Sequence, residues 1–313
     1  MTFPWKSGRA ICVGECMVEL ARGDDQRFGL GYGGDTFNTA VYLSRAGVAV
    51  AYATAVGDDP YSAGIVQTAR REAVDTDLIV TVPGRLPGLY LIETTPDGER
   101  TFWYWRDRAP ARELFELADA ERIADELRKA SLVYFSGITL SLYSERGLER
   151  FAAALQAARQ AGALVAMDSN YRPRGWGQNP ERARSVFERF WRIADIAMPT
   201  LEDERALWGD ADEQTTVSRL RGLGVREVAV KLGSRGAFVA AEGVEQLVPA
   251  DKGLRVVDTT AAGDSFNAGY LAARRAGASS VDAARQGSRL ASIVIQHRGA
   301  IVPAEATAAV LSD

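Results

Sequence analysis

A short stretch near the C-terminus combines an apolar run, small residues and a carboxyl group at an expected helix start. In VVDTTAAGDSFNAGY (256–270) we expect a strand over 254–258 and a helix from about Gly263. Ala261, Ala262 and Gly263 have no bulk that would block a ligand. The first turn of a helix leaves backbone N–H groups unpaired at the positive end of its dipole. The stretch therefore predicts a site for a phosphate, or for negative charge that grows during a reaction.

Asp264 lies in the first turn of that helix and has two interpretations. Asp is favoured in first turns for structural reasons alone. A carboxylate beside an anion site can also take the proton of a hydroxyl group that attacks a phosphoryl group, and a base of ordinary carboxylate pKa is then sufficient. The residue types by themselves leave both interpretations open.

A second segment, VKLGSRGAF (230–238), places Lys231 at a strand end and glycines in the turn that follows. Glycines at such a turn let the backbone lie against a nucleotide. An ordinary hairpin is the alternative. The residues that we expect to line the nucleotide are Lys231, Gly233, Ser234, Arg235 and Gly236, together with Asn170 after an earlier strand.

Short apolar runs alternate with amphipathic helical stretches along most of the chain. This alternation predicts an α/β fold with a mostly parallel sheet covered on both faces. The expected strands are 10–14, 48–57, 132–137, 163–170, 194–199, 227–233 and 236–241, and the clearest helices are 35–47, 144–162 and 179–194.

One region breaks this alternation. Residues 88–106, GLYLIETTPDGERTFWYWR, read as two strands with the bend at PDG. Such a hairpin must pack away from the parallel sheet, so we expect a small β lid over the open end of the main domain. Residues 17–34 are expected to add strands to this lid.

The lid hairpin also indicates the kind of substrate. Strand alternation places Phe102, Tyr104 and Arg106 on one face, and Trp103 and Trp105 on the other. A guanidinium binds a carboxylate through two parallel hydrogen bonds, which a neutral sugar does not need. The pattern therefore favours an anionic sugar derivative, although a solvated Arg106 is the structural alternative.

Further residues fit a substrate site of this kind. Arg172 follows a strand end and supplies a second positive charge, and Tyr90 on the partner strand offers a hydroxyl contact. In the segment GLGYGG (29–34), Gly33 and Gly34 let the backbone approach a small polar ligand, whose hydroxyl groups the following Asp35 and Asn38 could bond. GLGYGG also matches a dinucleotide fingerprint, but the polar RGDDQRF before it is not the strand which that fingerprint requires.

Composition excludes several other classes of function. The chain of 313 residues carries a net charge of −4 with interspersed charges, so we expect no nucleic-acid partner. We find no secretory signal and no apolar run of membrane-spanning length, so we expect no membrane association and a cytoplasmic location. The single histidine, His297, excludes a zinc site built on histidines.

Several long motifs in the same order resemble the ribokinase, or PfkB, family of sugar kinases. DTTAAGDSFNAGY resembles its C-terminal signature and GGDTFNTAVYLSRAG its N-terminal glycine-rich signature. GECMVEL, RLPGLYLIETTPDGERTFWYWR, NYRPRGW, TLEDERALWG and IQHRGAIVP resemble the 2-keto-3-deoxygluconate kinase branch. The resemblance extends along nearly the whole chain.

The resemblance implies a single ribokinase-like three-layer domain over 1–313 with a discontinuous β lid at about 17–34 and 88–106. It implies transfer of phosphate from ATP, with Mg²⁺, to the 6-hydroxyl of 2-keto-3-deoxy-D-gluconate. A monovalent cation such as K⁺ near residues 258–264 is a further family expectation. The alternatives are a kinase for a neutral sugar such as fructose or ribose, and a binding protein without catalysis. The exposed tryptophans of the lid favour a homo-oligomer.

The resemblance also assigns roles to residues. It implies Asp264 as the general base, residues 261–263 as the anion hole, and Gly34, Tyr90, Tyr104, Arg106 and Arg172 as contacts to the sugar acid. The chain departs from the family at Ala261, where glycine is frequent. It departs again at Thr200-Leu201-Glu202-Asp203, which replaces an N-x-x-E motif tied to magnesium and phosphate placement. No metal ligand is predicted among the side chains.

Overall fold

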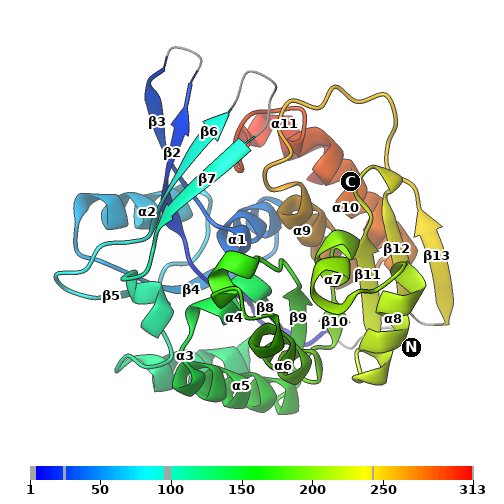
Figure 1. Cartoon of the computed structure of the whole chain (residues 1–313), viewed down its shortest axis with the longest axis horizontal. Coiled ribbons are helices and arrows are strands. Elements are labelled where there is room, and N and C mark those ends of the chain that lie inside the picture. Colours follow the sequence, from blue (N-terminus) through cyan, green and yellow to red (C-terminus); the bar gives the residue numbers. More distant parts are fainter. Residues whose placement is uncertain (1–4, 24–25, 95–99, 242, 312–313) are drawn as a thin grey trace.

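The computed structural model describes residues 5–23, 26–94, 100–241 and 243–311, in which helices cover both faces of a large sheet (Figure 1). The strand order is β13-β12-β11-β10-β9-β8-β1-β4-β5. Neighbouring strands run parallel from β11 to β5, whereas β12 and β13 pair antiparallel at one edge. The predicted α/β fold with a mostly parallel central sheet is therefore confirmed. The strands are β1 (Ala10–Val13), β4 (Val50–Val56), β5 (Ile79–Thr81), β8 (Leu132–Ser136), β9 (Leu164–Asp168), β10 (Ile196–Ala197), β11 (Glu227–Lys231), β12 (Ala237–Ala241) and β13 (Val244–Val248).

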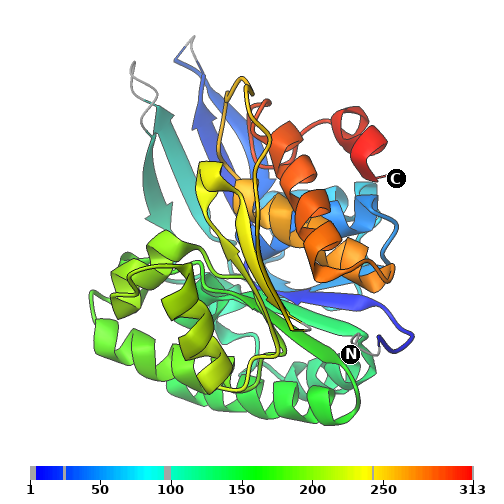
Figure 2. The ribbon, with the colours of Figure 1, turned by 90° about the vertical axis from the view of Figure 1, so that its right-hand side faces the viewer.

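The central strands are apolar on both faces because each face packs into its own core. In β1, Ile11 and Val13 enter one core, and Ala10 and Cys12 enter the other. Figure 2 shows the two helical layers on opposite sides of the sheet. The first core is covered by α3 (Ala120–Lys129), α4 (Gly137–Leu142), α5 (Glu145–Gln160), α6 (Pro180–Trp191), α7 (Leu201–Trp208) and α8 (Glu213–Gly222). The second is covered by α1 (Asp35–Arg45), α2 (Pro60–Arg71), α9 (Ala262–Arg275), α10 (Ser280–Val294) and α11 (Ala304–Leu311).

A separate four-stranded sheet, which we call the lid, stands over one end of the large sheet (Figure 1). Its order is β3-β2-β6-β7, and Met17, Tyr90 and Ile92 form a small core on one face. The glycine-rich GLGYGG falls mostly in β3, so it is part of a lid strand and not a nucleotide loop. The predicted bend at PDG lies outside the described residues. The strands are β2 (Met17–Arg22), β3 (Phe28–Gly33), β6 (Leu89–Thr94) and β7 (Arg100–Trp105).

The strand expected over residues 254–258 is wrong, because this segment is irregular. Val256 and Val257 are 57% and 42% exposed, so no sheet or core covers their side chains. The N–H groups of Val257 and Asp258 both donate to the carbonyl of Ile295, at the end of α10. The apolar residues of 254–258 alone did not distinguish a strand from an irregular loop whose backbone is hydrogen-bonded to the end of α10.

The strand order of the large sheet contains a switch point, which indicates where ligands bind. β1 and β8 are neighbours in the sheet. The chain continues from β1 to β4 on one side and from β8 to β9 on the other, so the direction in which strands are added reverses between them. In open α/β sheets, ligands bind beyond the carboxyl ends of the strands at such a point.

Among the described residues, no helix is both long and apolar enough to cross a membrane.

Candidate active site

A cleft of about 750 Å³ lies between the lid and the carboxyl ends of the strands. It contains Asp264 and also Arg106 and Arg172, three residues that come from distant parts of the chain. Its other lining residues are Glu15, Met17, Gly34, Asp35, Asn38, Tyr90, Thr101, Phe102, Tyr104, Ile138, Asp168, Asn170, Arg174, Thr200, Lys231 and residues 259–263. A larger hollow, of about 1010 Å³, lies beside the lid but contains no part of the start of α9.

The start of α9 forms one wall of the cleft. The helix begins at Ala262, and Ala261 before it has a left-handed backbone with φ of 59°. The N–H of Ala262 donates to the carbonyl of Thr259 at 3.2 Å, so it is already engaged. Helix geometry gives the N–H groups of Gly263 and Asp264 no partner within α9. Within the anion site predicted over 261–263, the N–H of Ala262 is thus engaged, while Gly263 and the adjacent Asp264 offer N–H groups; that these bind an anion stays a prediction.

The carboxyl group of Asp264 is 9% exposed and faces the same cleft. Asn38, on α1, donates its Nδ2 hydrogen bond to Asp264 Oδ2 at 2.8 Å. Burial and the negative charge of Asp35 raise the pKa of Asp264 above the ordinary aspartate value, and the bond from Asn38 opposes part of that rise. A carboxyl group with a raised pKa beside free helix N–H groups can accept a proton from a hydroxyl group as negative charge develops nearby.

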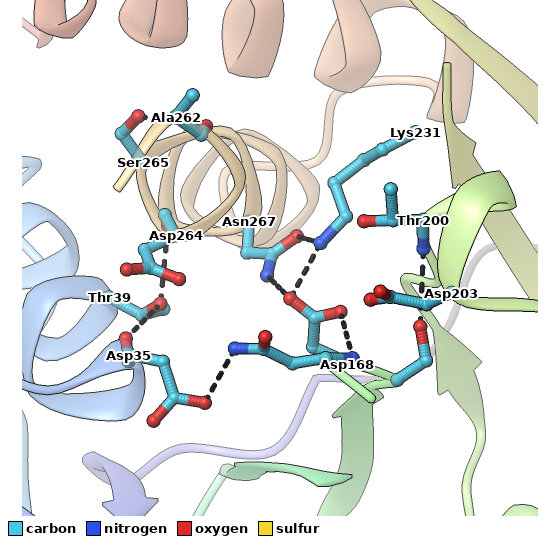
Figure 3. A network of polar contacts seen from close by, with 12 residues as sticks. Asp35, Thr39, Asp168, Thr200, Asp203, Lys231, Ala262, Asp264, Ser265 and Asn267 are labelled. Atoms are coloured by element: carbon cyan, nitrogen blue, oxygen red, sulfur yellow. Dashed lines mark hydrogen bonds and ion pairs between the residues drawn. The ribbon is translucent and has the colours of Figure 1, made fainter. Parts of the chain in front are cut away.

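A buried polar network connects this helix start to the strand ends (Figure 3). Lys231, at the end of β11, bonds to Asp168 Oδ2 at 2.6 Å and to Asn267 Oδ1 at 3.2 Å. A Cβ placed on Gly263 would lie 3.4 Å from Lys231 Nζ, so the ammonium group sits directly beside the start of α9. Asn170, with φ of 34°, donates to Asp35 Oδ2 at 2.9 Å. Lys231, paired with Asp168, thus brings an ammonium group that can donate hydrogen bonds beside the predicted anion site.

The lid and the loop after β9 bring arginines to the other part of the cleft. Arg106, just after β7, forms an ion pair with Glu15, whose side chain is 1% exposed. Arg172 forms an ion pair with Asp203 at 3.0 Å, and its side chain is 57% exposed. Both arginines that we predicted to hold a carboxylate therefore already have a carboxylate partner in the protein. Asp203 stands where the family's N-x-x-E motif has Glu, and its carboxylate is the partner of Arg172 in this ion pair.

The glycines and tyrosines predicted to contact substrate lie at or next to the cleft. Gly34 is required by close packing, since a Cβ there would lie 2.1 Å from the carbonyl oxygen of Glu15. Gly33 does not line the cleft, but a Cβ there would lie 2.7 Å from the hydroxyl of Tyr90. That hydroxyl donates to Glu19. Tyr104 lines the cleft from β7.

The predicted nucleotide segment is divided by the structure. Lys231 lines the cleft, whereas Gly233, Ser234, Arg235 and Gly236 do not. The first three of these four form a short 3-10 helix, η3 (Gly233–Arg235), in which Arg235 bonds to Glu213 of α8. Contact of this turn with a nucleotide stays a prediction.

Asp35 lines the cleft as expected, but three of its charged residues were missed as members of the candidate site: Glu15, Asp168 and Arg174. Asp168 carried a usable signal, because a carboxylate at the end of a buried parallel strand points to the ligand edge of the sheet. Glu15 follows directly after the strand expected over 10–14, and its side chain was not considered. Arg174 lies two residues beyond Arg172 in the same loop, and we considered only the first of the pair.

Comparison with known proteins agrees with this architecture. Residues 8–307 match the model of the pfkB family carbohydrate kinases, and the chain belongs to this family. It is 45% identical over 302 residues to a protein of Dickeya dadantii named 2-dehydro-3-deoxygluconokinase, covering 94% of this chain and 96% of that one.

Two further proteins extend the comparison. A protein of Escherichia coli K12 with the same name is 44% identical over 309 residues, covering 96% of this chain and 99% of that one. The crystal structure of 2-dehydro-3-deoxygluconokinase from Thermotoga maritima has a TM-score of 0.84 at 23% identity, covering 98% of this chain and 100% of that one. At this identity, the similarity to the Thermotoga maritima structure shows a common fold.

Proposed function

We propose that the protein is an ATP-dependent kinase that converts 2-keto-3-deoxy-D-gluconate to its 6-phosphate. The observation that carries the proposal is one cleft that contains Asp264 and the start of α9 together with three arginines from the lid and the β9 loop. A sugar acid carries both a hydroxyl group and a carboxylate, so it can use both kinds of group. The names of the 45% and 44% identical relatives support the same substrate.

In the proposed reaction Asp264 accepts the proton of the 6-hydroxyl as its oxygen attacks the γ-phosphorus of ATP. The bond between that phosphorus and the bridging oxygen breaks, and ADP leaves with the electron pair. The N–H groups of Gly263 and Asp264, with Lys231 beside them, stabilise the negative charge on the transferred group. Tyr90 and Asn38 lie where they can position the sugar chain.

Mg²⁺ neutralises phosphate charge when it enters with ATP. In the parts of the chain that the structure describes, no group of three or more His, Cys, Asp or Glu side chains is arranged to hold a metal ion. Mg²⁺ seldom needs an all-protein cage, so we propose that phosphate oxygens and water would be its main ligands. K⁺ near residues 258–264 stays a prediction. Because the reaction uses ATP, the proposal places it in the cytoplasm.

A substrate panel tests the proposal. ADP release is measured with 2-keto-3-deoxygluconate, its galactonate epimer, fructose and ribose. We expect kcat/KM to be highest for a keto-deoxy sugar acid, and Asp264→Asn to lower kcat by about 100- to 10,000-fold, as loss of a general base does. A higher kcat/KM with fructose or ribose would refute the sugar-acid assignment. Wild-type turnover by Asp264→Asn would refute the base assignment.

A further inference from the structure

We infer that Arg174, rather than Arg106 and Arg172 alone, supplies the net positive charge that recognises the substrate's carboxylate. This inference rests on the proposed function and specifies which residue of the cleft sets its preference for an anion. Sequence reasoning and the family resemblance had pointed only to Arg106 and Arg172.

The first argument is a comparison of ion pairs among the arginines that line the cleft. Arg106 is paired with Glu15, and Arg172 is paired with Asp203. For Arg174, by contrast, the described part of the chain provides neither an ion pair nor a side-chain hydrogen bond. A guanidinium beside a carboxylate can still donate hydrogen bonds, but the pair carries no net charge and attracts an anion only weakly. The charge of Arg174 is not offset in this way.

A fourth arginine lies near the ion pair of Arg106 and Glu15. Arg112 also acts electrostatically on Glu15, but it does not line the cleft. Arg112 is therefore not a direct contact for a ligand in the cleft. Arg174 is the guanidinium with direct access to the cleft and without a carboxylate neighbour that holds it.

The second argument is that Arg174 acts on the lid side of the cleft together with the other two arginines. Burial raises the pKa of the Tyr104 hydroxyl on the lid and the negative charge of Asp35 adds to that rise, whereas the positive charges of Arg106, Arg172 and Arg174 oppose it. The charged groups with the largest effects on Asp264 are Asp35, Asp168 and Lys231, and no arginine is among them. A carboxylate on the ligand is therefore attracted by the arginines more strongly beside Tyr104 than beside Asp264.

The third argument is that the backbone of Arg174 is held rigidly. Arg174 lies in η2 (Pro173–Trp176), a single turn that begins with proline. Trp176 is 2% exposed and packs against Phe187 with ring centroids 5.5 Å apart. A Cβ on Gly175 would lie 2.8 Å from the hydroxyl of Ser141, so the turn lies flush against α4. Only the side chain of Arg174 must be ordered when it binds an anion, which limits the entropy cost.

The test compares Arg174→Gln and Arg174→Lys with wild type. In Arg174→Gln we expect the KM for 2-keto-3-deoxygluconate to rise about 10- to 100-fold, the range for a lost hydrogen bond between charged groups. The KM for ATP stays within about two-fold, as expected for a residue outside the phosphate site. Arg174→Lys recovers part of the loss, because it keeps the charge but not the planar fork.

A matched control removes the same charge elsewhere. Arg128→Gln changes an exposed arginine on α3 that pairs with Asp125, and both KM values are expected to stay at wild-type levels. Thermal melting of each variant shows whether the fold is kept; Arg174 is exposed, so we expect no change.

The outcomes separate the inference from the proposed function. If wild type prefers fructose or ribose, both are overturned. If wild type prefers the sugar acid but Arg174→Gln keeps its KM for that acid, the inference alone is overturned. It is also overturned if the KM for ATP rises as much as that for the sugar acid, because Arg174 would then serve the nucleotide phosphates.

Discussion

At the scale of single residues, Asp264 and Asp35 are two carboxyl groups in one cleft, and the charge of Asp35 makes ionisation of Asp264 harder. Burial is the main cause of the raised pKa of Asp264, and the negative charge of Asp35 is the second. Burial also raises the pKa of Asp35, which the hydrogen bond with Ser136 opposes. Asp35 therefore belongs to the chemistry of the site, since it raises the proton affinity of the proposed base.

Replacing Asp35 with Asn tests this relation. Asn removes the negative charge but can still accept the hydrogen bond that Asn170 donates to position 35. Without that charge, the ionised form of Asp264 is less disfavoured, so its pKa falls. Because the proposed base works ionised, the acid limb of the pH profile of kcat/KM should move to lower pH.

Asp282→Asn is the control, since it removes an exposed carboxylate on α10, outside the cleft. Its profile should coincide with that of wild type, and ATP titrates alike in all three proteins. An acid limb that stays in place in Asp35→Asn, or moves to higher pH, would contradict the coupling of the two carboxyls.

The sequence predicted which residue types face the ligand better than it predicted their partners. Arg106 and Arg172 could be placed at one site with Asp264 because both arginines follow strands, and Asp264 lies in the first turn of a helix. Glu15 and Asp203 could not be predicted as their partners, because each ion pair joins segments that are far apart in the chain. Only packing of the lid on the main domain brings Arg106 to Glu15.

At the scale of elements, the start of α9 contains a strained residue. Ala261 is in the left-handed region with φ of 59°, where a side chain is unfavourable and glycine is not. The sequence showed alanine at a position where the resembling family frequently has glycine. It did not show the strain, because the left-handed conformation depends on how the irregular segment 254–258 approaches the helix.

Ala261→Gly should therefore stabilise the protein. Relief of the left-handed strain, less the added flexibility of the unfolded chain, leaves a gain of about 0.5–1 kcal/mol in the free energy of unfolding. Ala262→Gly is the matched control, because Ala262 is the first residue of α9 and should lose about 0.5–1 kcal/mol. Urea unfolding of both variants measures the difference, and equal destabilisation would show that Ala261 is unstrained.

At the scale of the whole molecule, alternating strands and helices were sufficient to predict the fold class, since each central strand is apolar on both faces. The lid could be predicted as a sheet, but its pairing of β2 with β6 could not, because those strands are separated by β3, α1, β4, α2 and β5. The outer face of the lid carries exposed apolar side chains, among them Leu30 at 54%, Trp103 at 50% and Trp105 at 61%. Such a patch is typical of a protein contact.

We therefore predict that two copies associate through the outer face of their lids. Leu30→Lys puts a charge on the edge strand β3 and should reduce the mass in solution to that of a 33.8 kDa monomer. Leu247→Lys is the control, because Leu247 is 44% exposed on β13, the edge strand of the large sheet, and its mass should equal that of wild type. Size-exclusion chromatography with light scattering measures all three.

The same strand links this contact to catalysis. In β7, Trp103 and Trp105 face outward while Tyr104 and the following Arg106 face the cleft. A partner that fixes the outer face would also hold the inner face against the substrate. Leu30→Lys should then raise the KM for the sugar acid, although Leu30 does not line the substrate cleft. A monomeric wild type, or a Leu30→Lys variant that keeps the wild-type mass, would exclude the lid as the site of association.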